Sequence, residues 1–177
     1  MISETYFLFG AASLATLGGA NDLRNARIPN RLTYSGLLLA LGFRFGLLGW
    51  PGLKSGTAGM LIAGLVFFIL FVIGAMGGGD VKLMASVGAW VGSEHVLIML
   101  LAAALAGGVL AIVFVLFRRG LYTAILNVLE LIRFRLTSGF NPHPLLNVRE
   151  VGTLRVPFGV AIAIGTFFCV GNAIWWR

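Results

Sequence analysis

The chain has six acidic residues, and only two of them are aspartates, Asp22 and Asp80. Asp22 follows the first apolar stretch of the sequence, and Asp80 precedes the fourth. Two carboxyl groups held close together cannot both ionise comfortably, so such a pair shares one proton. The ionised group can then take a proton from water while the protonated group polarises a peptide carbonyl. The two aspartates are therefore candidates for aspartic proteolysis, which needs no metal, no cofactor and no nucleophilic cysteine or serine.

A simpler explanation exists for each aspartate alone. An aspartate at a helix end commonly accepts hydrogen bonds from backbone N–H groups, so Asp22 and Asp80 could both be helix caps. Two features favour a function. Both aspartates are expected at the same face of a membrane, and three glycines, Gly77, Gly78 and Gly79, directly precede Asp80. Glycines leave room where the backbone bends or where another chain approaches closely.

The composition indicates where these residues are held. Of the 177 residues, 59% are apolar and 11% are charged, and the mean hydropathy is +0.97. Soluble domains contain about 25% charged residues, so the chain is not a soluble enzyme, a disordered tail or a disulfide scaffold. Its single cysteine, Cys169, can form neither an internal disulfide nor a paired-cysteine zinc site. The net charge of +7 comes from basic residues between apolar stretches, which indicates membrane orientation rather than nucleic-acid binding.

A helix needs about 20 apolar residues to cross a bilayer. The predicted spans are Thr5–Ala20, Leu32–Trp50, Ala58–Met76, Val81–Ser93, Val96–Phe117 and Val156–Trp176. The fourth span is short, but without it most basic residues would lie outside, against the positive-inside rule. We therefore expect an all-α polytopic membrane protein, residues 1–177 forming one domain, with six transmembrane helices and both termini outside.

Three further expectations concern the ends and the loops. The N-terminal residues carry no basic charge, so we expect the first apolar stretch to be a retained span and not a cleaved signal peptide. Apolar residues recur at helical spacing in the basic segment 118–155, which predicts an amphipathic helix at the cytoplasmic interface. Arg44 lies inside a span, and we expect it to extend toward the outer interface.

Three motifs resemble one known family. Gly77-Gly78-Gly79-Asp80 matches the GxGD motif of intramembrane aspartic proteases, and its continuation Val81–Ala85 resembles the GxGDxKL form of type IV prepilin peptidases. Asp22, followed by Arg27-Ile28-Pro29-Asn30-Arg31-Leu32, resembles the other aspartate region of that family. Arg155–Ala161 is similar to the segment that opens its last span. The resemblance covers most of the chain, and the order of the three motifs is specific.

The resemblance implies that Asp22 and Asp80 are the catalytic pair. Lys82 would either favour the ionised member of the pair through its charge or anchor the start of a helix at the interface. The residues implied to shape the site are Gly77, Gly79, Lys82, Pro29, Asn30, Pro157 and Gly159. Of these, Pro29 and Asn30 would form the turn into the second span, while Pro157 and Gly159 would line the site or serve helix packing. No metal ligand is implied.

One departure from the family pattern is informative. Larger prepilin peptidases carry a cytoplasmic insert with paired CxxC zinc motifs and also N-methylate the mature pilin, and this chain has neither the insert nor the cysteines. It resembles the small, peptidase-only form that serves Flp-type (Tad) pili, or the archaeal relatives of that form. The implied substrate is a prepilin with a short basic leader followed by an apolar helix, cut at the cytoplasmic face of the inner membrane. The implied partners are this prepilin, the lipid bilayer and other pilus assembly components, with no nucleic acid.

Two other classes of function remain open at this stage. Carboxylates at membrane depth also serve ion paths, so a small ion-coupled transporter is one alternative. The second alternative is a non-catalytic membrane subunit of a pilus or secretion machine, in which both aspartates only cap helices.

Overall fold

The computed structural model describes residues 2–73, 75–118 and 157–175, together with the single positions 126, 129, 130, 133, 134 and 137. Its helices are α1 (Ile2–Asn25), α2 (Asn30–Val72), α3 (Gly78–Arg118) and α5 (Phe158–Trp175). The predicted all-helical fold class is confirmed. Three of these helices, α2, α3 and α5, are long and apolar enough to cross a membrane.

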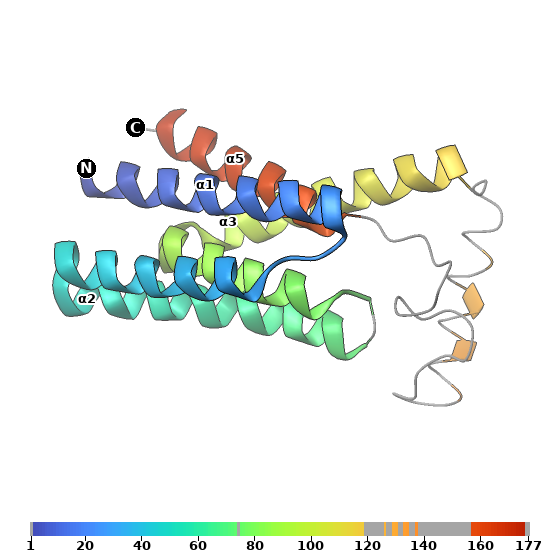
Figure 1. Ribbon diagram of the computed structural model, residues 1–177, viewed down its shortest axis with the longest axis horizontal. Helices are drawn as coiled ribbons and strands as arrows, with labels where there is room; N and C mark the ends of the chain where they lie inside the picture. The colour runs from blue at the N-terminus through green and yellow to red at the C-terminus, as the bar shows by residue number, and fades with distance from the viewer. Residues whose placement is uncertain are drawn as a thin grey trace.

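Helices α2 and α3 each bend back at one glycine. Gly49 interrupts α2 with φ 63° and ψ −149°, and Gly92 interrupts α3 with φ 73° and ψ 179°. Glycine adopts a positive φ at little steric cost, because it has no Cβ atom. Pro51 follows in the first turn of the second arm of α2, where the missing N–H of a proline is tolerated. Each helix therefore consists of two arms that run in opposite directions, as Figure 1 shows.

The helix count corrects the sequence prediction. The predicted span Leu32–Trp50 lies in α2, and so does Ala58–Met76 except for its last four residues, because α2 ends at Val72. Val81–Ser93 and Val96–Phe117 both lie in α3. The described residues thus form four helices rather than six, because a single glycine leaves the helical conformation at each turn and no loop separates the arms. The amphipathic helix predicted within 118–155 lies outside the described residues except for the six single positions named above.

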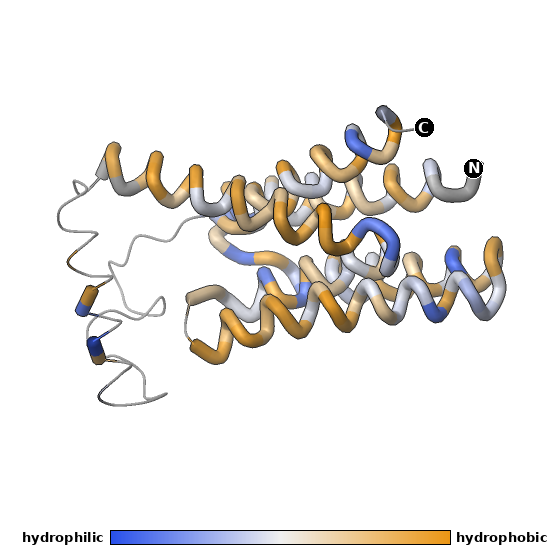
Figure 2. Tube along the Cα trace, turned by 180° about the vertical axis from the view of Figure 1, so that it is seen from behind, coloured by the Kyte–Doolittle hydropathy of each residue, from blue (hydrophilic) through white to orange (hydrophobic). Residues whose placement is uncertain are grey.

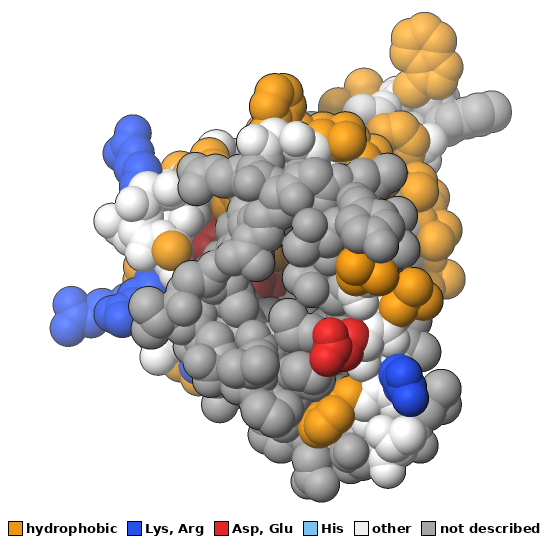
Figure 3. Space-filling model, turned by 90° about the vertical axis from the view of Figure 1, so that its right-hand side faces the viewer, with side chains coloured by type: hydrophobic (Ala, Val, Ile, Leu, Met, Phe, Trp, Pro, Cys, Tyr) orange, Lys and Arg blue, Asp and Glu red, His pale blue; other side chains and the backbone are white. Residues whose placement is uncertain are grey.

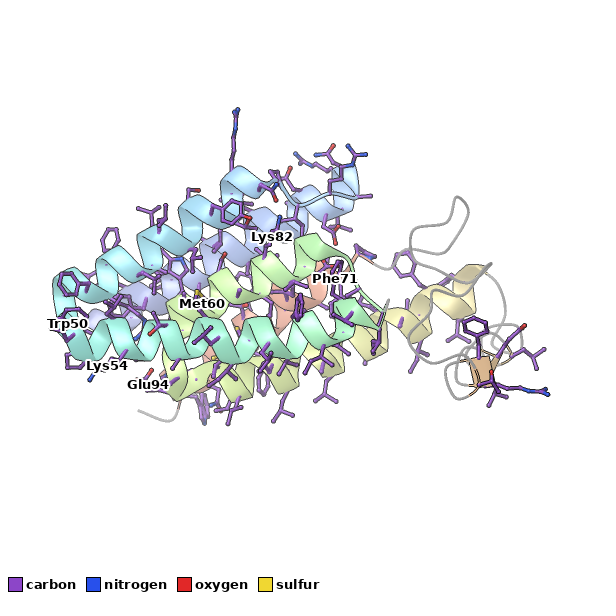
Figure 4. All side chains as sticks on the ribbon, turned by 90° about the horizontal axis from the view of Figure 1, so that it is seen from below. Trp50, Lys54, Met60, Phe71, Lys82 and Glu94 are labelled. Carbon is purple, nitrogen blue, oxygen red and sulfur yellow. The ribbon has the colours of Figure 1, made fainter. Side chains whose placement is uncertain are left out.

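The arms and helices lie side by side and define two ends of a bundle (Figure 1). At one end, α1 finishes, α2 begins and finishes, and α3 and α5 begin; we call this the aspartate end. At the other end lie the turns at Gly49 and Gly92, which we call the turn end. In Figure 4 the labelled residues Trp50 and Glu94 lie at the turn end, and Lys82 lies toward the aspartate end.

The outer surface of the bundle suits lipid. Large apolar side chains are exposed along the helices; Leu38 on α2 is 71% exposed and Leu105 on α3 is 73% exposed. Figure 2 shows hydrophobic residues along most of each helix. In water such an apolar surface would drive association, whereas in hydrocarbon it is favourable. The core inside is formed by α1, α2, α3 and α5 together.

Candidate active site

Asp22 is buried in the last turn of α1. The helix ends because Ala26 adopts the left-handed conformation (φ 50°), and the Ala26 N–H donates to the carbonyl oxygen of Asp22 at 2.9 Å. The Asp22 side chain is 4% exposed, and its Oδ2 atom accepts a hydrogen bond from the N–H of Gly159 at 2.9 Å. Its Oδ1 atom has no hydrogen-bond partner among the described residues.

Asp80 is buried in the first turn of α3, where it is also 4% exposed. Its Oδ2 atom accepts a hydrogen bond from the N–H of Gly77 at 3.1 Å, and its own N–H donates to the carbonyl oxygen of Gly77 at 3.1 Å. This is the arrangement in which an acidic side chain at the third helical position reaches back to the residue before the helix. The capping expected for Asp80 is therefore present, and it occupies Oδ2.

Helix α1 packs antiparallel to the first arm of α3. A Cβ atom at Gly10 would overlap the ring of Trp90, and a Cβ atom at Gly18 would lie 2.6 Å from Cδ2 of Leu83. An increase of eight positions along α1 thus corresponds to a decrease of seven along α3. The absence of side chains at Gly10 and Gly18 lets the two helices approach closely.

This register brings the two aspartates to the same level of the bundle. Asp22 lies one turn beyond Gly18 on the same face of α1, and Asp80 lies one turn before Leu83 on the same face of α3. Two carboxyl groups that are distant in sequence therefore lie at the same height on facing helices. The register therefore places the two carboxyl groups at one end of the bundle, on two helices that contact each other.

The residues between α1 and α2 contact the glycine motif. Ile28 is buried, and its Cβ atom lies 3.3 Å from where a Cβ atom at Gly79 would be. Pro29 then precedes α2 with φ −65° and ψ 134°, an extended conformation that starts the helix. A larger residue at Gly79 would press on Ile28, so the absence of a side chain there brings two of the motifs together.

Lys82 is held by the second motif. Its Nζ atom donates to Oδ1 of Asn30 at 2.9 Å and lies 5.4 Å from the centre of the Tyr34 ring. One turn further along, Ser86 Oγ donates to the carbonyl oxygen of Thr33 at 2.8 Å. The first arms of α2 and α3 are thus joined by polar contacts from the aspartate end inward, and Asn30 does more than shape the turn.

The third motif reaches Asp22 from the start of α5. Pro157 precedes the helix and accepts a hydrogen bond from the N–H of Val160 at 3.1 Å. The Phe158 ring packs edge-on against Phe67, with ring centres 6.0 Å apart. Gly159 then lies directly against Asp22, because a Cβ atom there would be 2.9 Å from the Asp22 Cβ. The structure therefore brings the predicted site residues of all three motifs to the aspartate end.

The prediction for Arg44 missed its burial and its partners. The side chain is 5% exposed, and its Nε and Nη2 atoms donate to the carbonyl oxygen of Trp90 at 3.3 and 3.0 Å. Its Nη1 atom donates to Ser55 Oγ at 2.9 Å, and Nη2 lies 4.0 Å from Oε2 of Glu94. The sequence analysis named no partner for Arg44, and these partners come from the second arm of α2 and from α3.

Basic side chains are exposed on the surface of the aspartate end. Arg24, Arg27 and Arg31 are exposed, and Figure 3, which looks onto the aspartate end, shows Lys and Arg side chains projecting at its edge. Within the described part of the chain, no three His, Cys, Asp or Glu side chains lie close enough together to hold a metal ion. A cavity of about 80 Å³ lies at the turn end beside Arg44 and Glu94, away from the aspartates.

Comparison with known proteins adds one finding. A model of the type IV leader peptidase family matches residues 8–112, which is more than half of the chain. The match includes both aspartates and ends before α5. Neither the curated proteins nor the solved structures give a significant match. The match and the apolar helices support a membrane protease of the leader-peptidase kind, and the chain belongs to the type IV leader peptidase family.

Proposed function

We propose that this protein is a membrane aspartic endopeptidase that removes the short basic leader from type IV prepilins of the Flp kind. Asp22 and Asp80 are the catalytic pair. The observation that supports this most strongly is the antiparallel register of α1 and α3, which sets two buried carboxyl groups at one level of the bundle. The family match covers both residues and names a type IV leader peptidase.

The proposed reaction is the hydrolysis of one peptide bond. The ionised carboxylate takes a proton from water while the protonated carboxyl group donates to the peptide carbonyl oxygen. The water oxygen bonds to the carbonyl carbon, the C–N bond then breaks, and the leaving nitrogen takes up a proton. The two aspartates titrate as a unit, so acid and base belong to the pair. No N-methyltransferase activity is part of the proposal.

The proposed topology counts each arm of α2 and α3 as one crossing and adds α1 and α5, which makes six crossings of the inner membrane. The aspartate end then faces the cytoplasm and both termini lie outside. The exposed Arg24, Arg27 and Arg31 at the aspartate end agree with the positive-inside rule. The substrate helix would lie in lipid against the exposed apolar side chains, with its leader junction at the aspartate end.

Seven residues complete the proposed site by shape and contact. They are Gly77, Gly79, Lys82, Pro29, Asn30, Pro157 and Gly159. Gly77 and Gly159 donate to the two aspartates, and Lys82 donates to Asn30. Gly79 lies against Ile28, while Pro29 and Pro157 precede α2 and α5.

The test is leader cleavage by purified protein carrying Asp22→Asn or Asp80→Asn, with Glu94→Gln at the turn end as the matched control. We expect both asparagine variants to insert normally and to lose cleavage by about 10²- to 10⁴-fold, because general acid–base catalysis is removed. The control should cleave as the unchanged protein does. Normal cleavage by either asparagine variant would contradict the proposal.

The capping hydrogen bonds favour one competing function, that of a non-catalytic subunit whose aspartates only stabilise helix ends. Under that reading the unchanged protein removes no leader, and the asparagine variants lose stability. The same purified proteins therefore decide between the two, once thermal unfolding is measured beside cleavage. Addition of a methyl donor to the cleavage assay tests the remaining point, since a methylated product would refute the peptidase-only assignment.

A further inference from the structure

We infer that Gly159, at the start of α5, is a positioning residue for Asp22. Its N–H group holds Oδ2 of the Asp22 carboxyl group, and this leaves Oδ1 as the oxygen that takes part in the reaction. The inference rests on the proposed catalytic pair and adds to it which oxygen reacts and what aims it.

The first observation is the hydrogen bond itself. The N–H of Gly159 donates to Oδ2 of Asp22 at 2.9 Å in a buried position, across a separation of 137 residues. The N–H groups of a first helical turn have no partner within their own helix and carry a partial positive charge. The start of α5 therefore favours a carboxylate at this place and fixes the rotation of the Asp22 side chain.

The second observation is the closeness of α1 and α5. A Cβ atom at Gly159 would lie 2.9 Å from Cβ of Asp22 and 3.2 Å from its Oδ2. From the other side, a Cβ atom at Gly19 would lie 2.9 Å from the carbonyl oxygen of Gly159. Any side chain at either position would push the start of α5 away from Asp22. Glycine is needed on both helices for the hydrogen bond to form.

The third observation is that the start of α5 is itself fixed. The Phe158 ring packs edge-on against the buried Phe67 and fills the space over Gly107, where a Cβ atom would overlap it. The donor N–H is therefore placed by packing on two other helices, and it does not depend on Asp22 for its position. A rigid donor is what a positioning role requires.

The remaining oxygen of Asp22 fits the reactive role. Oδ1 is buried and has no hydrogen-bond partner among the described residues. A buried carboxylate oxygen without a donor is unfavourable unless another group satisfies it. In the proposed reaction that group is the water or the peptide carbonyl of the substrate, so the fixed Oδ2 and the available Oδ1 have different tasks.

The experiment compares three substitutions in α5. Gly159→Ala places a methyl group against Asp22, Gly165→Ala places one against the Ala103 backbone, and Gly171→Ala places one in open space. We expect Gly159→Ala to lower kcat for leader cleavage by about 10²-fold with an unchanged KM, as a small misplacement of a catalytic group does. Gly171→Ala should match the unchanged protein, and Gly165→Ala should lose thermal stability but keep its kcat per folded molecule.

A second route protects the test against misfolding. Gly19→Ala disturbs the same contact from α1 without touching the carboxylate, and it should lower kcat in the same way. The inference is overturned if Gly159→Ala and Gly19→Ala keep the kcat of Gly171→Ala. It is also overturned if their losses of kcat only follow losses of stability, as generic packing damage would.

The Asp22→Asn variant, assayed in parallel, separates this inference from the proposed function. If that variant is inactive while both glycine variants cleave normally, only the positioning role fails. If it cleaves normally, the proposed function fails whatever the glycine variants do.

Discussion

The two ends of the bundle bury charged side chains in opposite ways. At the turn end, the Arg44 guanidinium donates to the Trp90 carbonyl oxygen and to Ser55 Oγ, and it lies close to Glu94. At the aspartate end, Asp22 engages one carboxylate oxygen and leaves the other without a partner among the described residues. At the turn end the buried guanidinium has hydrogen-bond partners, whereas at the aspartate end one oxygen of the buried Asp22 carboxyl group has none among the described residues.

The reason for the pairing at the turn end is the break at Gly92. Backbone groups beside a helix break lose their regular partners, and lipid offers none. Arg44 supplies donors for the Trp90 carbonyl, and Ser55 Oγ accepts the N–H of Ser93 at 3.2 Å. Arg44 is therefore a structural residue, whereas a buried aspartate with an available oxygen is what the proposed catalysis requires. Burial alone does not distinguish a structural charged residue from a catalytic one. The hydrogen-bond partners of the charged group do.

The largest expected effect on stability is that of Arg44→Met. Without the guanidinium the buried Trp90 carbonyl loses its donors, and we expect the free energy of unfolding to fall by about 1–3 kcal/mol. Leader cleavage per folded molecule should stay unchanged, which is the reverse of Asp80→Asn. Unfolding in mixed micelles and the cleavage assay measure the two quantities. A stable but inactive Arg44→Met protein would contradict the conclusion that Arg44 has a structural role and the aspartate end a catalytic one.

We expect a smaller loss of stability when the Lys82–Asn30 hydrogen bond is removed. This bond joins α2 and α3 at the aspartate end. Lys82→Met and Asn30→Ala should each destabilise the fold, and a double-mutant cycle should give a coupling of about 1 kcal/mol, because each removes the same bond. Additive losses would show that the two residues act separately. Tyr34→Leu serves as the control for the contact of Lys82 with the ring.

Glu94→Gln should change stability by less than about 1 kcal/mol, because exposed ion pairs contribute little. The Glu94 side chain is 53% exposed and lies 4.0 Å from Arg44, and a glutamine can still accept the hydrogen bond from Ser55. Thermal unfolding of this variant beside Arg44→Met identifies the main partner of Arg44. Equal losses would make Glu94 that partner, in place of the Trp90 carbonyl.

The smallest effect concerns Ala26, where α1 ends. Its positive φ of 50° is strained for a residue with a Cβ atom, while the turn end uses glycine at both positive-φ turns. Ala26→Gly should therefore stabilise the fold by about 1 kcal/mol or less, since relief of strain exceeds the added freedom of the unfolded chain. Thermal unfolding measures the gain. A loss of stability would show that the left-handed conformation is not strained here.

Much of the fold followed from local sequence. Apolar stretches of sufficient length predicted the helical segments, and the three motifs predicted the residues of the site. The predicted number of helices was wrong because of two glycines. Gly49 and Gly92 each turn a helix within one residue, so the described residues form four helices instead of six. The burial and the partners of Arg44 were not predicted, because those partners lie 46 and 11 residues away and no periodicity in the sequence reveals them.

By itself, the sequence determined that the chain is a helical membrane protein and that Asp22 and Asp80 are its candidate catalytic groups. These follow from composition, from the length of apolar stretches and from motifs, which are local properties. Only the tertiary structure decided that the N–H of Gly159 donates to Asp22 and that Arg44 donates to the Trp90 carbonyl oxygen. Such pairings depend on the register between helices, which is set where glycines allow close approach and not by the pattern within any one helix.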